Sequence, residues 1–119
     1  MQSLNPQIDL LGRLISATET RQKVISHNLA NVNTPEYRRL EVDFESQLSA
    51  ELARGDSGGS MPVQATIRES TGRTARADGN TVDVDQEIGE LNKNALLQQM
   101  YLQLLGTELS QMRLAIEGS

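Results

Sequence analysis

Apolar residues recur at alternating steps of three and four positions near both ends of this chain. The spacing runs from Ile8 to Val32 and again from Val84 to Ile116. It is typical of paired helices that bury a narrow apolar stripe along their length. The sequence therefore predicts two long helices. The predicted seam comprises Ile8, Leu11, Ile15, Thr18, Gln22, Ile25, Leu29 and Val32 in the first helix and Val84, Ile88, Leu91, Ala95, Gln98, Leu102, Leu105, Leu109, Met112 and Ile116 in the second.

Local signals place the ends of both helices. Asn5 is a good N-cap, and Pro6 follows at the first helical position, where a missing N–H costs nothing. Pro35 disfavours helical backbone at the residue before it, so the first helix is expected to end near residues 31–33. Asp83 begins a sequence typical of a capping box and is the expected N-cap of the second helix.

The stretch between the helices has weaker patterns. Leu40, Val42 and Phe44 alternate with charged residues, which favours an extended piece before a short helix. The predicted fold is all-α: a coiled-coil-like hairpin of two long terminal helices with a short extended and loop segment in the middle. Its parts are the N-terminal helix (1–34), a Thr-Pro turn with the extended piece and the short helix (35–54), a flexible Gly/Ser/Thr-rich segment without core residues (55–81) and the C-terminal heptad helix (82–119).

The polar members of the predicted seam suggest how the two helices align. If the helices pair antiparallel, one alignment places Gln22 opposite Gln98, and Thr18 then lies opposite Leu102. A buried amide without a partner costs about 1–3 kcal/mol, so a paired polar layer is expected to fix this register. The pairing could form within one chain or between neighbouring copies.

The second helix carries more apolar surface than one partner can cover. Leu97, Met100, Tyr101 and Leu104 widen its stripe around the helix. A helix that is apolar on more than one side needs more than one packing partner. The chain as a whole is 37% hydrophobic and 3% aromatic, which provides little for a self-sufficient core. These features indicate a protein that is completed by neighbouring chains.

Composition argues against other classes of protein. The net charge is −5, whereas nucleic-acid binding requires a clustered basic face. The chain has no cysteine, and its one histidine, His27, has no neighbouring metal ligands, so we expect no metal and no other cofactor. We find no catalytic constellation, and we expect neither an enzyme nor a small-molecule substrate. No apolar run reaches the roughly 20 residues of a membrane span, and the amino terminus lacks the pattern of a cleaved signal peptide.

A distinctive string of residues surrounds the predicted end of the first helix. Its members are Asn28, Leu29, Ala30, Asn31, Thr34, Pro35 and Tyr37. This string resembles the amino-terminal signature of bacterial flagellar basal-body rod and hook proteins. The stretches 42–48, 78–85 and 90–96 narrow the resemblance to proteins of the proximal rod. Glu36 departs from the pattern, because the family usually has Gly after Thr-Pro, and a glutamate disfavours the positive φ that Gly permits.

The resemblance implies a structural role. Subunits of this family are exported through the flagellar type III apparatus without a cleaved signal peptide. They stack helically into the periplasm-spanning rod of the basal body, which transmits torque from the MS ring for motility. The implied partners are copies of the chain itself, other rod proteins, and the MS-ring and adaptor or export-gate proteins at the rod base. The alternative from the helix pattern alone is a soluble helical-hairpin chaperone or adaptor of a secretion system, which should form a discrete dimer.

Overall fold

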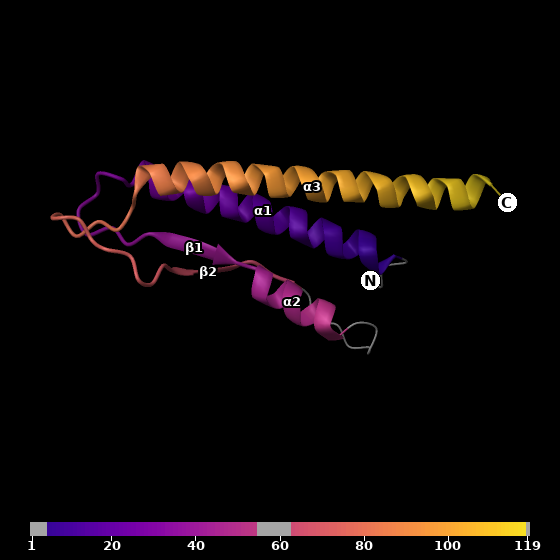
Figure 1. Ribbon diagram of the computed structural model, residues 1–119, viewed down its shortest axis with the longest axis horizontal. Coiled ribbons are helices and arrows are strands. Elements are labelled where there is room, and N and C mark those ends of the chain that lie inside the picture. Colours follow the sequence, from indigo (N-terminus) through magenta and orange to yellow (C-terminus); the bar gives the residue numbers. More distant parts are fainter. Residues whose placement is uncertain (1–4, 55–62, 119) are drawn as a thin grey trace.

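A computed structural model of the protein describes residues 5–54 and 63–118. Its elements are α1 (Pro6–Ala30), β1 (Leu40–Asp43), α2 (Glu45–Arg54), β2 (Thr66–Glu69) and α3 (Val84–Glu117). α1 and α3 lie side by side, and the start of α1 and the end of α3 lie at the same end of the molecule (Figure 1). The two long helices therefore form an antiparallel hairpin, as predicted, in a molecule with extents of 66 × 26 × 22 Å.

Both long helices begin at the predicted N-caps. The side-chain oxygen of Asn5 accepts hydrogen bonds from the backbone N–H groups of Gln7 and Ile8 at 3.0 and 3.2 Å. Asp83 accepts equivalent bonds from the second and third residues after it, at 3.0 and 3.3 Å. Each cap satisfies N–H groups that have no partner inside the helix. These two predictions are confirmed.

A two-stranded antiparallel sheet packs against α1 and lies below the helix pair in Figure 1. Leu40 of β1 lies opposite Glu69 of β2, and Asp43 lies opposite Thr66. The sequence predicted the extended piece at β1 but no partner strand for it. The predicted all-α fold class is therefore right for the helices but omits the two-stranded sheet. All residues of β2 are exposed, which leaves no apolar alternation to reveal the strand.

The segment predicted to be flexible contains core residues. Residues 55–62 lie outside the described residues, but Val63, Asn80 and Thr81 are buried. The prediction that 55–81 holds no core residue is therefore wrong at these three positions, whereas residues 64–79 are exposed or half-buried. Asn80 and Thr81 are buried because distant segments provide hydrogen-bond partners for them, and apolar spacing does not reveal such partners.

The apolar core lies where α1 packs between α3 and the sheet. Its buried members are Leu14, Ala17, Val24, Val42, Phe44, Val63 and Tyr101. Arg21 holds the start of α2 to this core, because its guanidinium lies 4.5 Å from the centre of the Phe44 ring and donates to the Glu45 carboxylate at 2.6 and 2.7 Å. Burial alone would raise the pKa of Glu45, but the hydrogen bonds and the charge of Arg21 hold that pKa below its usual value.

The alignment of the two long helices differs from the predicted one. Asn94 Nδ2 donates to the backbone oxygen of Thr18 at 2.8 Å, so Thr18 lies beside Asn94 and not beside Leu102. Asn28 likewise meets Glu87, where the predicted alignment has position 92, so at 1.5 Å per residue α3 is shifted by about 8–12 Å from that alignment. Gln22 is exposed, and the predicted layer of Gln22 and Gln98 does not form. The predicted register is wrong.

The register differs because α3 packs against α1 with a different face from the one that the apolar spacing predicts. The buried and half-buried residues of that face are Glu87, Leu91, Asn94, Gln98, Tyr101, Leu105, Glu108 and Met112. These residues keep the spacing of three and four positions. Glu87 and Asn94, however, take the places that the predicted seam assigns to their apolar neighbours Ile88 and Ala95. Glu87 and Asn94 can be buried because each is hydrogen-bonded to α1. A pattern that counts only apolar positions therefore selects the adjoining face of the helix.

Candidate functional site

A cluster of buried polar residues joins the elements at the closed end of the hairpin, where α1 ends and α3 begins. We call Asn28, Tyr37, Arg39, Asn80, Thr81 and Glu87 the polar cluster. Asn28 is fully buried, and its Nδ2 donates to the backbone oxygen of Leu40 at 2.8 Å and to Glu87 Oε2 at 3.3 Å. Its Oδ1 accepts from the Leu40 N–H at 3.0 Å and from the Tyr37 hydroxyl at 2.9 Å. One signature asparagine thus ties α1 to both β1 and α3.

An ion pair lies at the centre of the polar cluster. Glu87 is 0% exposed and Arg39 only 6%, and the Nε of Arg39 donates to Glu87 Oε1. Arg39 also donates to the hydroxyl of Ser70, and its backbone N–H donates to Thr81 Oγ1 at 2.8 Å. A buried ion pair is tolerated when further hydrogen bonds satisfy both groups. Here Ser70 and Asn28 supply them.

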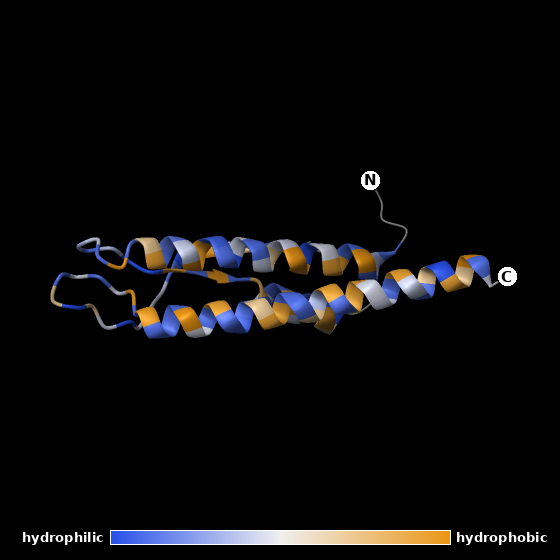
Figure 2. Cartoon of the chain, turned by 90° about the horizontal axis from the view of Figure 1, so that it is seen from above, coloured by the Kyte–Doolittle hydropathy of each residue, from blue (hydrophilic) through white to orange (hydrophobic). Residues whose placement is uncertain are grey.

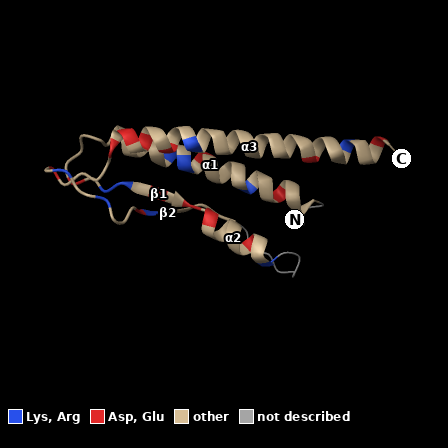
Figure 3. Ribbon diagram, in the orientation of Figure 1, with Lys and Arg blue, Asp and Glu red and all other residues tan. Residues whose placement is uncertain are grey.

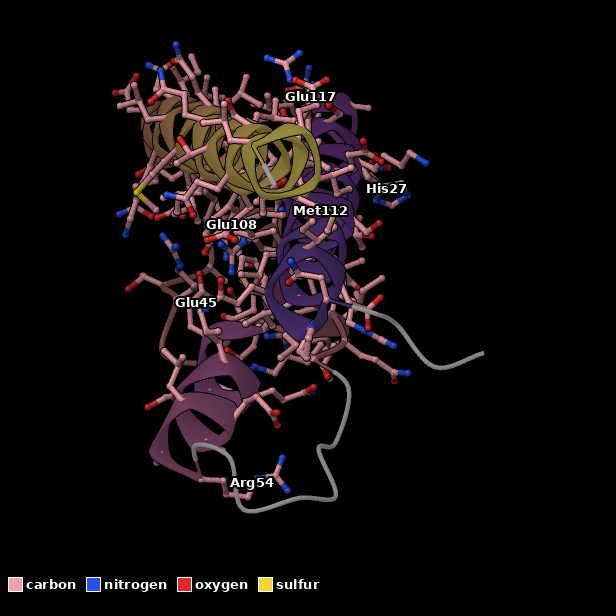
Figure 4. The ribbon with its side chains drawn as sticks, turned by 90° about the vertical axis from the view of Figure 1, so that its right-hand side faces the viewer. His27, Glu45, Arg54, Glu108, Met112 and Glu117 are labelled. Carbon is pink, nitrogen blue, oxygen red and sulfur yellow. The ribbon has the colours of Figure 1, made fainter. Side chains whose placement is uncertain are left out.

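Tyr37 extends this network to the surface. Its hydroxyl donates to Asn28 Oδ1, and its oxygen lies 2.7 Å from His27 Nδ1. Burial, and then the negative charge of Glu87, raise the pKa of Tyr37 above its usual value. The hydroxyl therefore keeps its proton, and His27 Nδ1 must be the donor of the second bond. His27 itself is exposed and lies at the outer edge of α1 in the side view along the hairpin (Figure 4), with its ring centre 5.7 Å from that of Tyr37.

Asn80 closes the turn that follows α1. Its Nδ2 donates to three backbone oxygens, those of Asn31 at 2.9 Å, Val32 at 3.2 Å and Thr34 at 2.8 Å. Its Oδ1 accepts from the N–H of Val82 at 2.7 Å. These oxygens belong to the C-cap residue Asn31 and to the turn beyond it, so an amide from a distant segment holds the turn after α1 in place.

The signature residues divide into two groups. Asn28, Asn31, Thr34 and Tyr37 form hydrogen bonds inside the chain, Asn31 to the backbone oxygen of His27 at 2.8 Å and Thr34 to Asn31 Oδ1 at 3.0 Å. The remaining members are outside this network: Leu29 is half-buried, and Ala30 and Pro35 are exposed. The polar part of the signature is therefore largely occupied with holding the hairpin end together.

Glu36 adopts the conformation that the sequence left in doubt. Its φ is +62°, so the turn keeps the left-handed backbone expected of a Gly at this position. The N–H of Glu36 donates to the backbone oxygen of Asp78 at 2.8 Å. Gly79, with φ +82°, lies against it, and a Cβ there would sit 3.3 Å from the Glu36 Cα. Close packing of these two turns holds Glu36 in a strained conformation.

Glu36→Gly is expected to raise the free energy of unfolding by about 1 kcal/mol, because it removes the cost of a left-handed non-glycine residue. Denaturant unfolding followed by circular dichroism measures the change. Glu36→Ala is the matched control, since it keeps a Cβ and should give no such gain. Equal stabilisation by both variants would show that backbone strain is not the cause.

The residues of the predicted seam occupy two different positions. Leu11, Ile25, Leu91, Gln98, Leu105 and Met112 are buried or half-buried between the helices, whereas Ile88, Leu102, Leu109 and Ile116 are exposed. Residues seven positions apart differ by only about 20° around a helix, so the exposed group forms one stripe along α3. Figure 2 shows apolar residues along the whole of α3, including the end that extends past α1.

The exposed stripe of α3 continues onto α1. At 3.6 residues per turn, the stripe lies on the same side of the helix pair as the half-buried seam residues of α1 and the exposed Gln22. This side is opposite the sheet. We call it the outer flank, and its members are Ile8, Ile15, Gln22 and Leu29 of α1 and Val84, Ile88, Leu102, Leu109 and Ile116 of α3.

Charge is distributed unevenly along α3. Residues 94–107 carry no charged side chain, and Figure 3 shows the acidic residues of α3 gathered mainly at its start. Leu96, Met100 and Leu104, on further sides of this uncharged stretch, are also exposed. None of the described helices is long and apolar enough to cross a membrane. Within the described residues, no group of His, Cys, Asp and Glu could hold a metal ion.

Sequence reasoning missed the residues at the centre of the polar cluster. Glu87 stands in the first turn of α3, where the helix dipole favours any acidic residue, and Asn80 follows Asp78 and Gly79 in a stretch typical of a turn. Nothing in their local spacing distinguishes them, because their partners lie far away in the chain, as with Arg39 and Glu87. The stretches 78–85 and 90–96 stand out by resemblance, which is a signal for Asn80 and Thr81 but not for Glu87.

Comparison with known proteins identifies sequence relatives of this chain. Residues 15–38, which include most of the signature, match the family described as flagella basal body rod protein. FlgB of Salmonella typhimurium is 33% identical, with 82% of this chain and 83% of that protein covered. FlgB of Cereibacter sphaeroides is 30% identical over 99% of both chains, and FlgB of Bacillus subtilis is 26% identical over 99% of this chain and 98% of its own.

The protein is thus a structural component of the flagellar basal body rod and not an enzyme. More narrowly, the chain belongs to the FlgB family of rod proteins. The resemblance noted in the sequence is confirmed, and so is the expected basal-body setting.

Proposed function

We propose that this chain polymerises helically into the rod through its outer flank and that the assembled rod, spanning the periplasm, transmits torque from the MS ring. The observation that carries the proposal is the exposed apolar stripe on α3. It supports assembly because a helix that is apolar on several sides is stable only when other helices cover it. The partners would be other copies of the chain and neighbouring rod proteins.

The energetics favour such assembly. Leu102, Leu109 and Ile116 are each about half exposed or more. Full burial of a large aliphatic side chain contributes about 1.5–3 kcal/mol, so the stripe can supply a substantial part of an interface. Repeated contacts between different surfaces of identical subunits generate open helical assemblies.

The polar cluster has a different task in this proposal. It holds the ends of α1 and α3 in one fixed arrangement, so that the two halves of the outer flank lie on one side. A subunit that transmits torque must not shear between its own helices. Ring and export-gate proteins at the rod base, and export without a cleaved signal peptide, remain parts of the proposal that rest on the family.

Deletion and complementation test the function. A bacterium from which the gene for this chain has been deleted should be non-motile, and the wild-type gene should restore swimming. Purified basal bodies should then contain the chain in the rod fraction. A motile deletion strain would contradict the proposal, as would a chain found only as a soluble dimer, the result expected of a secretion adaptor.

A further inference from the structure

A second apolar stripe runs along α3, apart from the outer flank. It consists of Leu96, Met100 and Leu104, each one turn after the last, and of Leu114, which returns to the side of Leu96 about five turns later. We call these residues the far stripe. They are 68%, 46%, 47% and 62% exposed, and none of them belongs to the apolar core of the described residues or packs against it. The folded subunit therefore leaves a second set of large apolar side chains uncovered.

The far stripe and the outer flank lie on nearly opposite sides of α3. Met100 and Leu102 are two positions apart, which is about 200° around a helix of 3.6 residues per turn. Asn94, which is hydrogen-bonded to α1, lies about 120° from Met100, so the far stripe is also turned away from α1. α3 thus presents two separate apolar surfaces to its surroundings.

Two different surfaces on one subunit are what an open helical assembly requires. A patch that meets its own copy closes a two-fold pair, whereas a contact between two different patches of identical subunits continues from copy to copy. The outer flank is one such patch. Apart from the far stripe, the only other large exposed apolar residues within the described part of the chain are Leu52 on α2 and Ile67 on β2. Each of these stands alone on its element, so the far stripe is the counterpart that the chain offers.

The shapes of the two surfaces match. Leu96, Met100 and Leu104 form a row at four-residue spacing, which is the kind of ridge that packs between the rows of side chains on other helices. The outer flank supplies two such rows side by side, one from α1 and one from α3. A ridge from a neighbouring α3 can therefore lie along the line where the two helices of the flank meet.

The charge pattern of α3 also permits this contact. Residues 94–107 carry no charged side chain, and they include most of the far stripe together with Leu102 of the outer flank. Burial of an unpaired charge is strongly unfavourable, and the middle of this contact requires none.

We infer that the far stripe of one copy packs onto the outer flank of the next copy in the rod. Each subunit then uses both surfaces of α3, one toward each neighbour, and all copies point the same way. The inference rests on the proposed function and names the partner surface that covers the outer flank.

Met100→Asp, expressed in the deletion strain, tests the contact. A carboxylate at this exposed position stays solvated in the free chain but would be buried in the contact, so the variant should fold normally by circular dichroism. Its amount in purified basal bodies should fall by about tenfold or more. Ser110→Asp is the matched control, because it adds the same carboxylate to an exposed side of α3 about 80° from both Met100 and Leu102. This control variant should be incorporated normally.

Photo-cross-linking identifies what covers the far stripe. Benzoylphenylalanine in place of Met100 should give a covalent dimer of the chain when basal bodies are irradiated. Peptide mapping should place the link on the outer flank, at residues such as Ile15, Ile88 or Leu102. Because position 100 faces away from the outer flank of its own chain, such a link joins two copies.

These measurements separate the contact from the proposed function. A dimer linked at the outer flank, with selective loss of Met100→Asp from rods, supports the contact. Suppose that Leu102→Asp, the matching change on the outer flank, is excluded from rods. If Met100→Asp is then incorporated as well as Ser110→Asp, or if position 100 links to another surface, to another protein or to nothing, this inference is overturned while the proposed function stands. If Leu102→Asp is incorporated like the wild-type chain, the proposed function fails first.

Discussion

Glu87→Leu is expected to lower the free energy of unfolding by about 3–5 kcal/mol, the cost of removing one partner of a buried ion pair. Arg39 would remain buried with its charge uncompensated, and Asn28 would lose one of the acceptors of its amide. Domains of this size are stable by only about 5–15 kcal/mol. The variant should therefore be partly unfolded at growth temperature, although Glu87 is a polar residue that does not belong to the apolar core.

Denaturant unfolding measures this loss, and two variants control for it. Glu69→Leu makes the same replacement at an exposed glutamate of β2 and should change stability by less than about 0.5 kcal/mol. Arg39→Met combined with Glu87→Leu removes both charges and should recover much of the loss, since an apolar pair can replace a buried ion pair. A loss no larger for Glu87→Leu than for Glu69→Leu would mean that the ion pair does not hold the hairpin end.

Leu102→Asp is expected to abolish rod assembly while leaving the subunit folded. Leu102 is 50% exposed on the outer flank, so a carboxylate there remains solvated in the free chain and changes its stability little. In an assembled rod the same carboxylate would be buried against a neighbour without a partner, which is strongly unfavourable. Cells carrying the variant should be non-motile, and their basal bodies should lack the chain.

Leu52→Asp is the matched control for this experiment. Leu52 is 66% exposed on α2, on the other side of the molecule from the outer flank, and receives the same change. Motility and circular dichroism, measured for both variants, separate a failure of assembly from a failure of folding. Normal swimming with Leu102→Asp, or equal loss with both variants, would argue against the outer flank as the assembly surface.

Much of the fold could be predicted from local sequence signals. The stripes of apolar residues identified both long helices, and the capping residues Asn5 and Asp83 located their starts. The alternation of Leu40 and Val42 identified β1. These features depend on residues close together in the chain, where spacing and backbone preference are informative.

The rotation and register of the helix pair could not be predicted in this way. They depend on Glu87 and Asn94, which are buried because residues on α1 satisfy them. Asn80 likewise lies in the core through backbone oxygens almost fifty positions earlier. Such placements require knowledge of which distant groups meet. The apolar residues of α3 that this interface leaves uncovered include the ones that form the outer flank.

Electron cryomicroscopy of purified basal bodies containing this chain tests the central claim most directly. The account predicts that Leu102, Leu109 and Ile116 lie against helices of neighbouring subunits and are withdrawn from solvent along the rod. It also predicts that the hydrogen bonds of Asn28 and Glu87 stay within each subunit. Density in which the outer flank of the assembled subunit faces solvent would contradict the account.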